Sequence, residues 1–503
     1  MNYASAVKQL GLLGAGFGAG ALMAQGLAPV SALWAAPVGL LCLAVLFSLT
    51  ERPARAGQLG WVFGLGYFSV GLSWIMEPFQ VDAAAYGWMA PFALVGLAGG
   101  LALFWAVAFW AAARLGVRQG RILALIVTWS FAELARAYVL TGFPWAGFAQ
   151  LALPGDLALR LVPFVGAHGV GVLMLAAVLP LACLRWRPHL LLVSVASVGL
   201  AGGLSLVPRG EVAGGSAVVR IVQPNAPQAE KWLPEKRWVF FQRLLDFSAE
   251  PTAEDGRPEL VVWPETAVPT LQNYIDELTS VMLSSLHGAE LLYGIQREEN
   301  GRYMNSAVVM SAEGEALDTY DKVHLVPFGE YMPLPALWER FGVFGLAARA
   351  NAGYAPGMER RLMETPVGRA LPLICYEGVF AQDVNATAAR ADYIVLITND
   401  GWFGTQSGPY QHLVQAQLRA AEQGLPMLRA ANTGISAVID AKGQILDQLP
   451  LGEAGFIDAA LPGALPPTLY SRTGDWPVLV LALLGLLLSI ATRLRRNSAR
   501  TLA

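Results

Sequence analysis

The sequence predicts a chain of two parts, a membrane domain of eight helical spans and an exported α/β domain. Charge is scarce: 14% of the 503 residues are charged and 55% are apolar, whereas soluble domains carry about a quarter charged residues. The mean hydropathy is +0.47. The charges that do occur concentrate between residues 210 and 470, where short apolar runs alternate with amphipathic ones.

This composition excludes several classes of protein. A disordered chain, a basic nucleic-acid-binding protein and an ordinary cytosolic enzyme of this length would all carry more charge. The formal net charge of −3 gives no sign of a polyanionic partner. We therefore expect a chain embedded in a membrane, with no nucleic acid among its partners.

The predicted spans occupy stretches without Asp, Glu, Lys or Arg, since a span needs about 20 apolar residues. These stretches are residues 9–50, which hold two spans, and 56–76, 83–113, 161–184, 188–208 and 476–492. A further span is predicted from Ile122 to Val139, where Glu133 and Arg136 share one helix face. Residues 1–208 thus form a membrane domain of seven helices, and residues 471–503 hold the eighth helix and a basic tail.

Lys and Arg mark alternate connections between the predicted spans. They are Lys8, Arg52, Arg55, Arg114, Arg118, Arg121, Arg185 and Arg187, followed by Arg493, Arg495, Arg496 and Arg500 in the tail. Short loops rich in Lys and Arg remain in the cytoplasm. Both termini are therefore predicted in the cytoplasm, and residues 209–470 on the opposite side of the membrane.

Residues 209–470 alternate between strand and helix patterns, which predicts one α/β domain with helices on both faces of its sheet. The predicted strands are Ala217–Val222, Leu260–Trp263, Glu290–Ile295, Ser306–Met310, Ala370–Ile374, Tyr393–Ile397, Met427–Ala430 and Ser436–Ile439. The predicted helices are Glu235–Ser248, Leu271–Leu286 and Tyr410–Gln423.

Cys375 is the one cysteine of this domain, because Cys42 and Cys183 fall in predicted spans. In an oxidising compartment a lone cysteine is either a small buried core residue or a reactive thiol. Cys375 directly follows an apolar strand, and Glu265 ends another. Reactive groups in open α/β sheets gather beyond the carboxyl ends of strands, and this placement favours the reactive interpretation.

A Glu, a Lys and a Cys together suit acyl transfer through a thioester. A thiol with a pKa of about 8.5 is mostly protonated at neutral pH, so a base such as Glu265 must take its proton. Lys322 would supply positive charge for the oxyanion, and the backbone N–H of Tyr376 a second donor. Each residue also has a structural interpretation, Glu265 as a strand-end cap and Lys322 as a solvated loop charge.

Several segments resemble the nitrilase superfamily, whose Glu-Lys-Cys triad sits on an αββα sandwich. They are Trp263–Glu265, Tyr320–Lys322, Cys375–Glu377, Ile397–Gly404 and Arg429–Ser436. A nitrilase-like domain between a seventh and an eighth span resembles, more closely, the bacterial apolipoprotein N-acyltransferases. The segments Thr141–Trp145, Gln223–Gln228 and Lys231-Trp232 are similar to the same family.

The resemblance implies an enzyme of the Gram-negative cytoplasmic membrane with a periplasmic catalytic domain. Such an enzyme moves an acyl chain from a glycerophospholipid to the α-amino group of an apolipoprotein's diacylglyceryl-cysteine, and no metal or cofactor is expected. Carried over, Cys375 is the nucleophile, Glu265 the base, Lys322 the oxyanion partner and Glu330 their support. The implied substrate-shaping residues are Trp232, Tyr376 and Glu377.

Three alternatives remain open from the sequence. A membrane-tethered amidase could use the same triad with water as acceptor. A Cys–His pair could form with His324 or His412. The chain could also be a transporter with a sensor domain. Such a protein would be expected to place polar residues within its spans, whereas those found there, Glu133, Arg136 and His168, are few.

The segment from Phe341 to Pro356 is apolar and rich in Gly and Ala. It would serve either as a cover for a lipid chain or as a core-packing loop.

Overall fold

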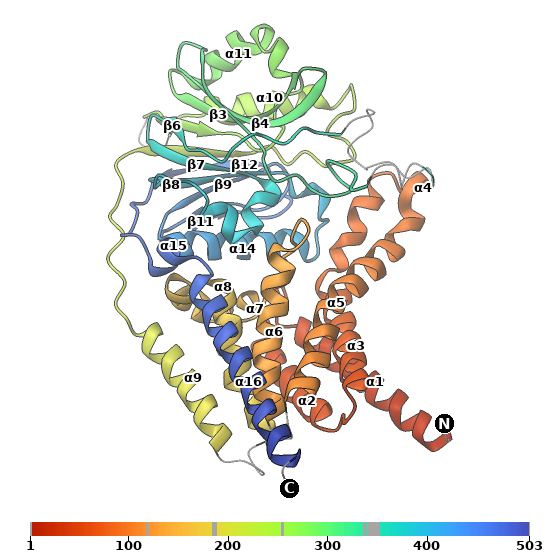
Figure 1. The fold of residues 1–503 in the computed structure, drawn as a ribbon. Coiled ribbons are helices and arrows are strands. Elements are labelled where there is room, and N and C mark those ends of the chain that lie inside the picture. The colour runs from red at the N-terminus through yellow and green to blue at the C-terminus, as the bar shows by residue number, and fades with distance from the viewer. Residues whose placement is uncertain are drawn as a thin grey trace. The chain divides into compact units, whose positions relative to one another are not determined.

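The computed structural model of the chain describes residues 3–116, 120–183, 189–252, 256–334, 340 and 353–501. The chain forms two compact units (Figure 1). The helical unit comprises Met1–Met76, Trp88–Arg209 and Leu469–Ala503, and the sheet unit comprises Glu77–Gly87 and Gly210–Thr468. Residues 341–352 of the predicted apolar cover lie outside the described residues.

A helix of the helical unit lies at each position where a span was predicted. These helices are α1 (Tyr3–Ala24), α2 (Ala35–Ser48), α3 (Pro53–Gly71), α5 (Ala90–Leu115), α6 (Gly120–Tyr138), α8 (Leu157–Val178), α9 (His189–Ser205) and α16 (Trp476–Thr501). Among neighbours in sequence, α1 packs on α2, α5 on α6 and α8 on α9.

The predicted number of eight spans is not supported by the lengths and compositions of these helices. Within the described residues, three segments are long and apolar enough to cross a membrane: Ala83–Leu115, Leu157–Ala182 and Trp476–Arg495. A fourth arises if α3 and the 3-10 helix η1 (Ser73–Gln80), bent by 48°, count as one span. The difference has a physical origin, because α2 has 14 residues and α6 carries Arg121, Glu133 and Arg136.

The charged residues of α6 are paired inside the helical unit. Arg136 Nη2 lies 2.7 Å from Glu133 Oε2, and both residues are buried. The indole N–H of Trp105 donates to Glu133 at 2.7 Å, and Arg136 Nη1 donates to the backbone carbonyl of Trp145 at 2.7 Å. These contacts give the two charges a structural explanation, because buried charges need partners that satisfy them.

The sheet unit contains two six-stranded sheets. The first sheet has the order β12 (Gly455–Ala460), β1 (Val218–Gln223), β2 (Leu260–Val262), β3 (Glu290–Glu299), β4 (Arg302–Met310), β5 (Ala316–Asp321). The second sheet has the order β11 (Ile445–Leu449), β10 (Ser436–Ile439), β9 (Met427–Ala431), β8 (Tyr393–Thr398), β7 (Gly368–Ile374), β6 (Met363–Thr365). Each of the eight predicted strands is present, whereas β5, β6, β11 and β12 were not predicted.

Each sheet has three parallel strands at its centre and antiparallel strands at its edges. In the first sheet β1, β2 and β3 are parallel, with Val261 opposite Leu291. In the second sheet β7, β8 and β9 are parallel, with Ile374 opposite Ile397. Parallel strands are buried on both faces and therefore read as continuous apolar runs, which is why all six of these strands were visible in the sequence.

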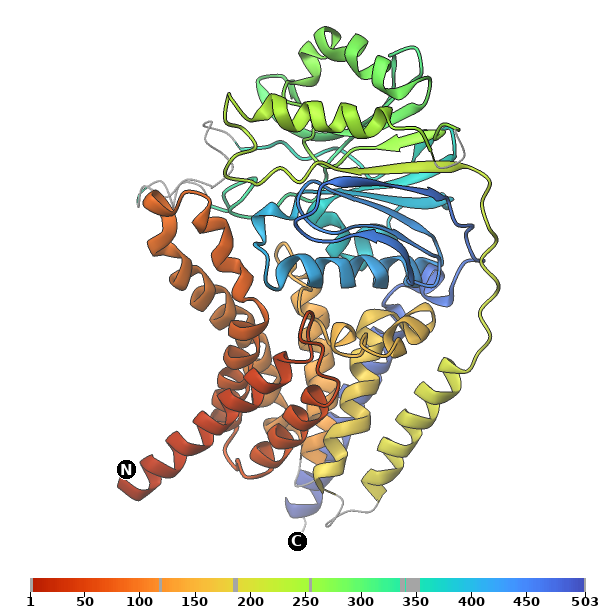
Figure 2. The same cartoon turned by 180° about the vertical axis from the view of Figure 1, so that it is seen from behind.

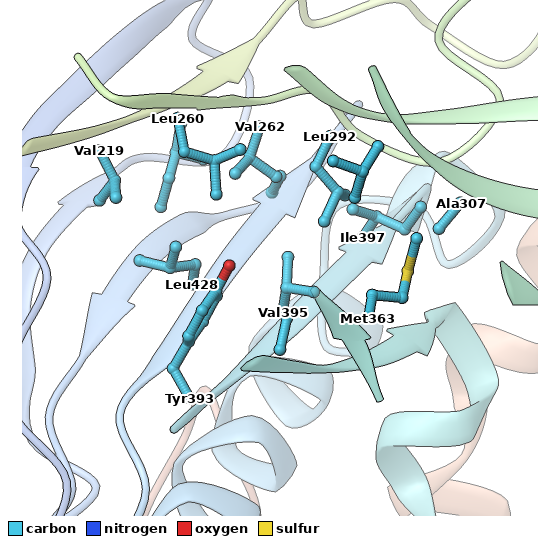
Figure 3. Packing of buried hydrophobic residues seen from close by; sticks show 14 of the residues in the cluster. Val219, Leu260, Val262, Leu292, Ala307, Met363, Tyr393, Val395, Ile397 and Leu428 are labelled. Carbon is cyan, nitrogen blue, oxygen red and sulfur yellow. The ribbon is translucent and has the colours of Figure 1, made fainter. Parts of the chain in front are cut away.

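The sheet unit has four layers, helix, sheet, sheet and helix (Figure 2). Helices α10 (Arg237–Ala249) and α11 (Asp276–Leu286) pack on the outer face of the first sheet. Helix α14 (Gly408–Gln423) packs on the outer face of the second. Between the sheets lies a shared apolar core (Figure 3), which includes Val219, Leu260, Val262, Leu292, Ala307, Met363, Tyr393, Val395, Ile397 and Leu428. The predicted αββα arrangement is confirmed.

Candidate active site

Cys375 lies at a sharp turn immediately after β7. It begins the short 3-10 helix η6 (Cys375–Val379), and its φ is +50°, a left-handed conformation that a residue with a Cβ seldom adopts. The side chain is buried, with 5% of the residue exposed. Backbone conformations of this kind persist where the surroundings enforce them, and they cluster at functional sites.

The enforcing contacts come from the fully buried carboxylate of Glu377. One of its oxygens accepts from the backbone N–H of Ile374 at 2.8 Å. The other accepts from the hydroxyl of Tyr320 at 2.9 Å and from the N–H groups of Val323 and His324 at 2.9 and 3.1 Å. Glu377 therefore joins the turn at the end of β7 to the loop after β5.

That loop carries Lys322, which is 1% exposed. The Lys322 Nζ atom lies 2.9 Å from Glu330 Oε1 and 3.7 Å from Glu265 Oε1. Its backbone N–H donates to the carbonyl of Asn305 at 2.8 Å, so β4 fixes where the side chain starts. The structure thus brings together Lys322 and the two carboxylates that the sequence predicted beside it.

Glu265 and Glu330 also share an amide donor, Asn305 of β4. Its Nδ2 atom donates to Glu265 Oε1 at 2.7 Å and to Glu330 Oε1 at 3.2 Å. Glu330 is held further by the N–H of Val326, which donates to Oε2 at 2.8 Å. Both carboxylates are buried, so each depends on these donors and on Lys322 for the stabilisation that water would otherwise give.

Burial raises the pKa of the Cys375 thiol far above its usual value, and the negative charge of Glu265 raises it further. Lys322 and a hydrogen bond with Thr398 act in the opposite direction without overcoming burial. The thiol is therefore protonated at neutral pH in the resting site. A base must remove its proton before the sulfur can act as a nucleophile.

The pKa of Lys322 shifts in the direction that keeps it charged. Burial by itself would lower this pKa, but the carboxylates of Glu330 and Glu265 outweigh burial and raise it above the usual value. Lys322 is consequently a permanent cation, and its charge acts on the Cys375 thiol. This arrangement can stabilise negative charge that develops next to Cys375.

The remaining predicted residues lie at different depths. Tyr376 is buried, and its ring packs edge-on against His324 and Phe380 at centroid distances of 5.5 and 4.8 Å. Trp232 is 43% exposed, and its ring faces the Lys231 ammonium at 5.4 Å. Glu377 bonds to the protein's own backbone, so its position fits support of the site better than contact with a substrate.

The two histidines of the alternative Cys–His pair have other partners. His324 Nδ1 lies 2.7 Å from Asp383 Oδ2, and its ring stacks on Phe380 at 3.9 Å. His412 Nδ1 lies 2.9 Å from Asp400 Oδ1. Both imidazoles are thereby held by carboxylates away from Cys375, which argues against either as the base for the thiol.

Asp400 anchors a second buried network behind the thiol. Its carboxylate accepts from Arg429 at 2.7 Å and from the Thr398 hydroxyl at 3.0 Å. Burial alone would raise the pKa of Asp400, but Arg429 and His412 lower it to about 2. Asp400 is therefore a permanent anion that fixes the loop after β8, and Thr398 connects that loop to Cys375.

The sequence motifs that carried no predicted role meet in one place. The Asn432 side chain donates to the carbonyl of Ala226 and to Asn399 Oδ1, both at 2.9 Å. Asn399 donates in turn to Gln228 at 2.6 Å. The segments 223–228, 397–404 and 429–436 are thus linked to one another, and the second of them carries Thr398 and Asp400.

Sequence reasoning missed Asn305 and assigned no role to Lys231, Thr398 or Asp400. The signal for Asn305 was a polar residue that directly precedes the apolar run Ser306–Met310. Across the described residues, no group of three or more His, Cys, Asp or Glu side chains could hold a metal ion.

Two family models match this chain in separate regions. The model described as carbon-nitrogen hydrolase matches residues 218–465. The model described as apolipoprotein N-acyltransferase N-terminal domain matches residues 19–179.

Curated relatives match nearly the whole chain. The apolipoprotein N-acyltransferase of Brucella melitensis is 39% identical over 459 residues, which cover 87% of this chain and 85% of the relative. That of Bradyrhizobium diazoefficiens is 38% identical over 515 residues, covering 95% and 94%. Among solved structures, a nitrilase-superfamily amidase from Nesterenkonia is 22% identical with a TM-score of 0.36, covering 51% of this chain and 93% of the amidase.

Proposed function

Because the chain belongs to the apolipoprotein N-acyltransferase family, we propose that it moves an acyl chain from a glycerophospholipid to an apolipoprotein. The acceptor is the α-amino group of the protein's N-terminal diacylglyceryl-cysteine, and the acyl chain passes through a thioester on Cys375. The observation that carries this proposal is the buried cluster in which Lys322 lies 2.9 Å from Glu330 and 3.7 Å from Glu265.

In the first half-reaction Glu265 takes the proton of the Cys375 thiol, and the sulfur attacks an ester carbonyl of the phospholipid. The carbonyl oxygen becomes an oxyanion, which the Lys322 ammonium and the N–H of Tyr376 stabilise. When the C–O bond breaks, Glu265 returns the proton to the departing lysophospholipid. The products are a Cys375 thioester and a lysophospholipid, so atoms and charge balance.

In the second half-reaction the α-amine of the apolipoprotein attacks the thioester carbonyl. Glu265 now removes a proton from the attacking nitrogen, and the same two donors stabilise the second oxyanion. The C–S bond breaks, the sulfur regains a proton from Glu265, and an amide remains on the acceptor. Two half-reactions through one covalent intermediate predict ping-pong kinetics.

Glu330 has a supporting role in this scheme. Its contact with Lys322 at 2.9 Å fixes the ammonium, and its charge offsets part of the cation's burial cost. The backbone N–H of Val326 keeps Glu330 itself in place. Glu330 is therefore assigned to holding the cation, and Glu265 to proton transfer.

The chain is a bacterial membrane protein, since its relatives are bacterial enzymes and its helical unit is apolar. We place it in the cytoplasmic membrane with both termini in the cytoplasm, on the distribution of Lys and Arg. Residues 209–470 then form the periplasmic catalytic domain, between the membrane domain of residues 1–208 and the final helix and tail of residues 471–503. Both lipid substrates would reach the site from the membrane.

The proposal is tested by incubating the purified full chain with phospholipid alone and measuring its intact mass. We expect a gain of one acyl group at Cys375 that hydroxylamine removes and that a diacylglyceryl-cysteine peptide discharges. The Cys375→Ala variant should never acquire the adduct. Steady release of free fatty acid without acceptor, at the rate of lipid turnover, would instead identify a tethered hydrolase. Full activity of Cys375→Ala would reject the thioester altogether.

A further inference from the structure

Lys231 is a buried lysine close to the proposed active site. It follows the segment Gln223–Gln228 through a tight turn, in which its N–H donates to the carbonyl of Pro227 at 2.9 Å. The residue is 5% exposed, whereas the next residue, Trp232, is 43% exposed. Lysine is almost never buried to this degree without a specific partner, so the contacts of its ammonium group need an explanation.

Those contacts converge on the turn that presents Glu265. The Lys231 Nζ atom donates to the backbone carbonyl of Glu265 at 3.2 Å and to the hydroxyl of Thr266 at 3.0 Å. The ring of Trp232 faces the same ammonium at 5.4 Å. An ammonium has three donors, and two oxygens and one aromatic face accommodate them.

The turn itself needs support, because Thr266 has a left-handed φ of +47°. On one side β3 supports it, since Gly294 donates to the carbonyl of Pro264 at 3.2 Å and accepts from the N–H of Ala267 at 2.8 Å. The two backbones are so close that a Cβ on Gly294 would lie 2.6 Å from the Cα of Glu265. Lys231 adds side-chain contacts to the same turn.

We propose that Lys231 is a positioning residue for the base, holding the Glu265–Thr266 turn so that the Glu265 carboxylate meets Lys322 and Asn305. This inference rests on the proposed function, in which Glu265 takes the thiol proton. Lys231 acts on the backbone of Glu265 and on Thr266, so it affects the reaction through Glu265.

The charge state of Lys231 fits a role based on hydrogen bonds. Burial lowers the pKa of Lys231 to about 7, with the Glu265 carboxylate opposing that shift. Around neutral pH the side chain is therefore present both as an ammonium and as an amine. Either form donates the two hydrogen bonds to the turn.

A double-mutant cycle separates this role from general support of the fold. We expect Lys231→Met, which keeps most of the length of the side chain and removes its donors, to slow single-turnover acylation of Cys375 roughly 10²-fold, the order of loss that accompanies a misplaced catalytic group. The half-saturating phospholipid concentration should stay within about twofold, because proton transfer and lipid binding are separate. In a Glu265→Gln background the same change should cost less than about threefold.

Lys236→Met is the matched control, since its side chain is 49% exposed and pairs with Glu230 at 3.6 Å; it should acylate at the wild-type rate. An equal loss from Lys231→Met with and without Glu265→Gln would overturn the inference, as would an unimpaired single variant. If Lys231→Met does not fold, Thr266→Val removes one of the two acceptors, and wild-type acylation by that variant would overturn the inference. Normal acylation by Glu265→Gln alone would refute the proposed base and leave Lys231 with nothing to position.

Discussion

Replacing Lys322 with Met would leave two buried carboxylates beside each other without their shared cation. The Oε1 atoms of Glu265 and Glu330 lie 2.7 and 3.2 Å from the same Asn305 nitrogen, so they are at most 5.9 Å apart. Two unit charges at that separation repel by about 3 kcal/mol at an effective dielectric constant of 20. Loss of one partner from a buried ion pair commonly costs about 3–5 kcal/mol, and the two figures agree.

This repulsion predicts how the stability of Lys322→Met depends on pH. In the folded variant a proton stays bound to the pair of carboxylates and relieves the repulsion. At the same pH the unfolded chain has already released that proton. The variant's free energy of unfolding should therefore decrease as the pH rises from 5 to 8. Wild type lacks this contribution, because the raised pKa of Lys322 keeps its own stabilisation intact until the pH exceeds the ordinary lysine value, so the loss should appear as a difference between the variant and wild type.

Acylation of Cys375 should fall by about 10²–10³-fold in Lys322→Met, the cost of removing one oxyanion donor. The matched variant Lys322→Arg keeps a cation and should lose much less. Single-turnover mass spectrometry gives the acylation rates, and denaturant unfolding at pH 5 and pH 8 gives the stabilities. Equal and mild effects of Met and Arg would remove Lys322 from the reacting site. A Met variant with a flat pH dependence would refute the argument from buried repulsion.

Three further predictions concern the base, the turn that carries it and the network behind the thiol. Glu265→Gln should slow acylation of Cys375 by about 10²–10⁴-fold, because the amide keeps the shape but accepts no proton; acylation at the wild-type rate by this variant would return attention to the histidines. Gly294→Ala should destabilise the chain by about 1–3 kcal/mol and slow acylation, since the new Cβ would lie 2.5 Å from a backbone oxygen; wild-type unfolding and rates would contradict this. Asp400 has its pKa lowered from 3.8 to about 2 despite burial, so it contributes about 2 kcal/mol that is present above pH 4 and lost as the pH falls toward 2. In Asp400→Asn the free energy of unfolding should lack this loss between pH 4 and pH 2. If the variant and wild type lose stability equally in acid, Asp400 makes no such contribution.

The sequence alone was sufficient to predict those site residues whose position follows from a single strand. Cys375 and Glu265 come at the ends of apolar parallel strands, and that placement can be read without knowing the neighbours. Asn305 could not be found in this way, because its role depends on which loops lie beside β4. Lys231 was visible as part of a motif, but its partner is the backbone carbonyl of Glu265. Every residue has such a carbonyl, so the residue type alone could not predict this contact.

The helical unit shows a different limit of sequence reasoning. The positions of the apolar helices were predicted correctly, but the predicted number of eight spans is not supported, because charge-free stretches do not report where a helix bends or ends. The bend of 48° after α3 is one such case. In the sheet unit, β5 was missed because five of its six residues are exposed or half-buried, so it lacks the continuous apolar run of a buried strand.

The proposed triad draws its members from both sheets, which has a consequence for the timing of its assembly. Glu265 and Lys322 follow strands of the first sheet, and Cys375 follows β7 of the second. Glu265 and Lys322 are synthesised before Cys375. The thiol meets them only after the two sheets have packed together. Under the proposed function, a nascent chain already surrounded by membrane lipid would be unreactive until the two sheets of the domain have packed together.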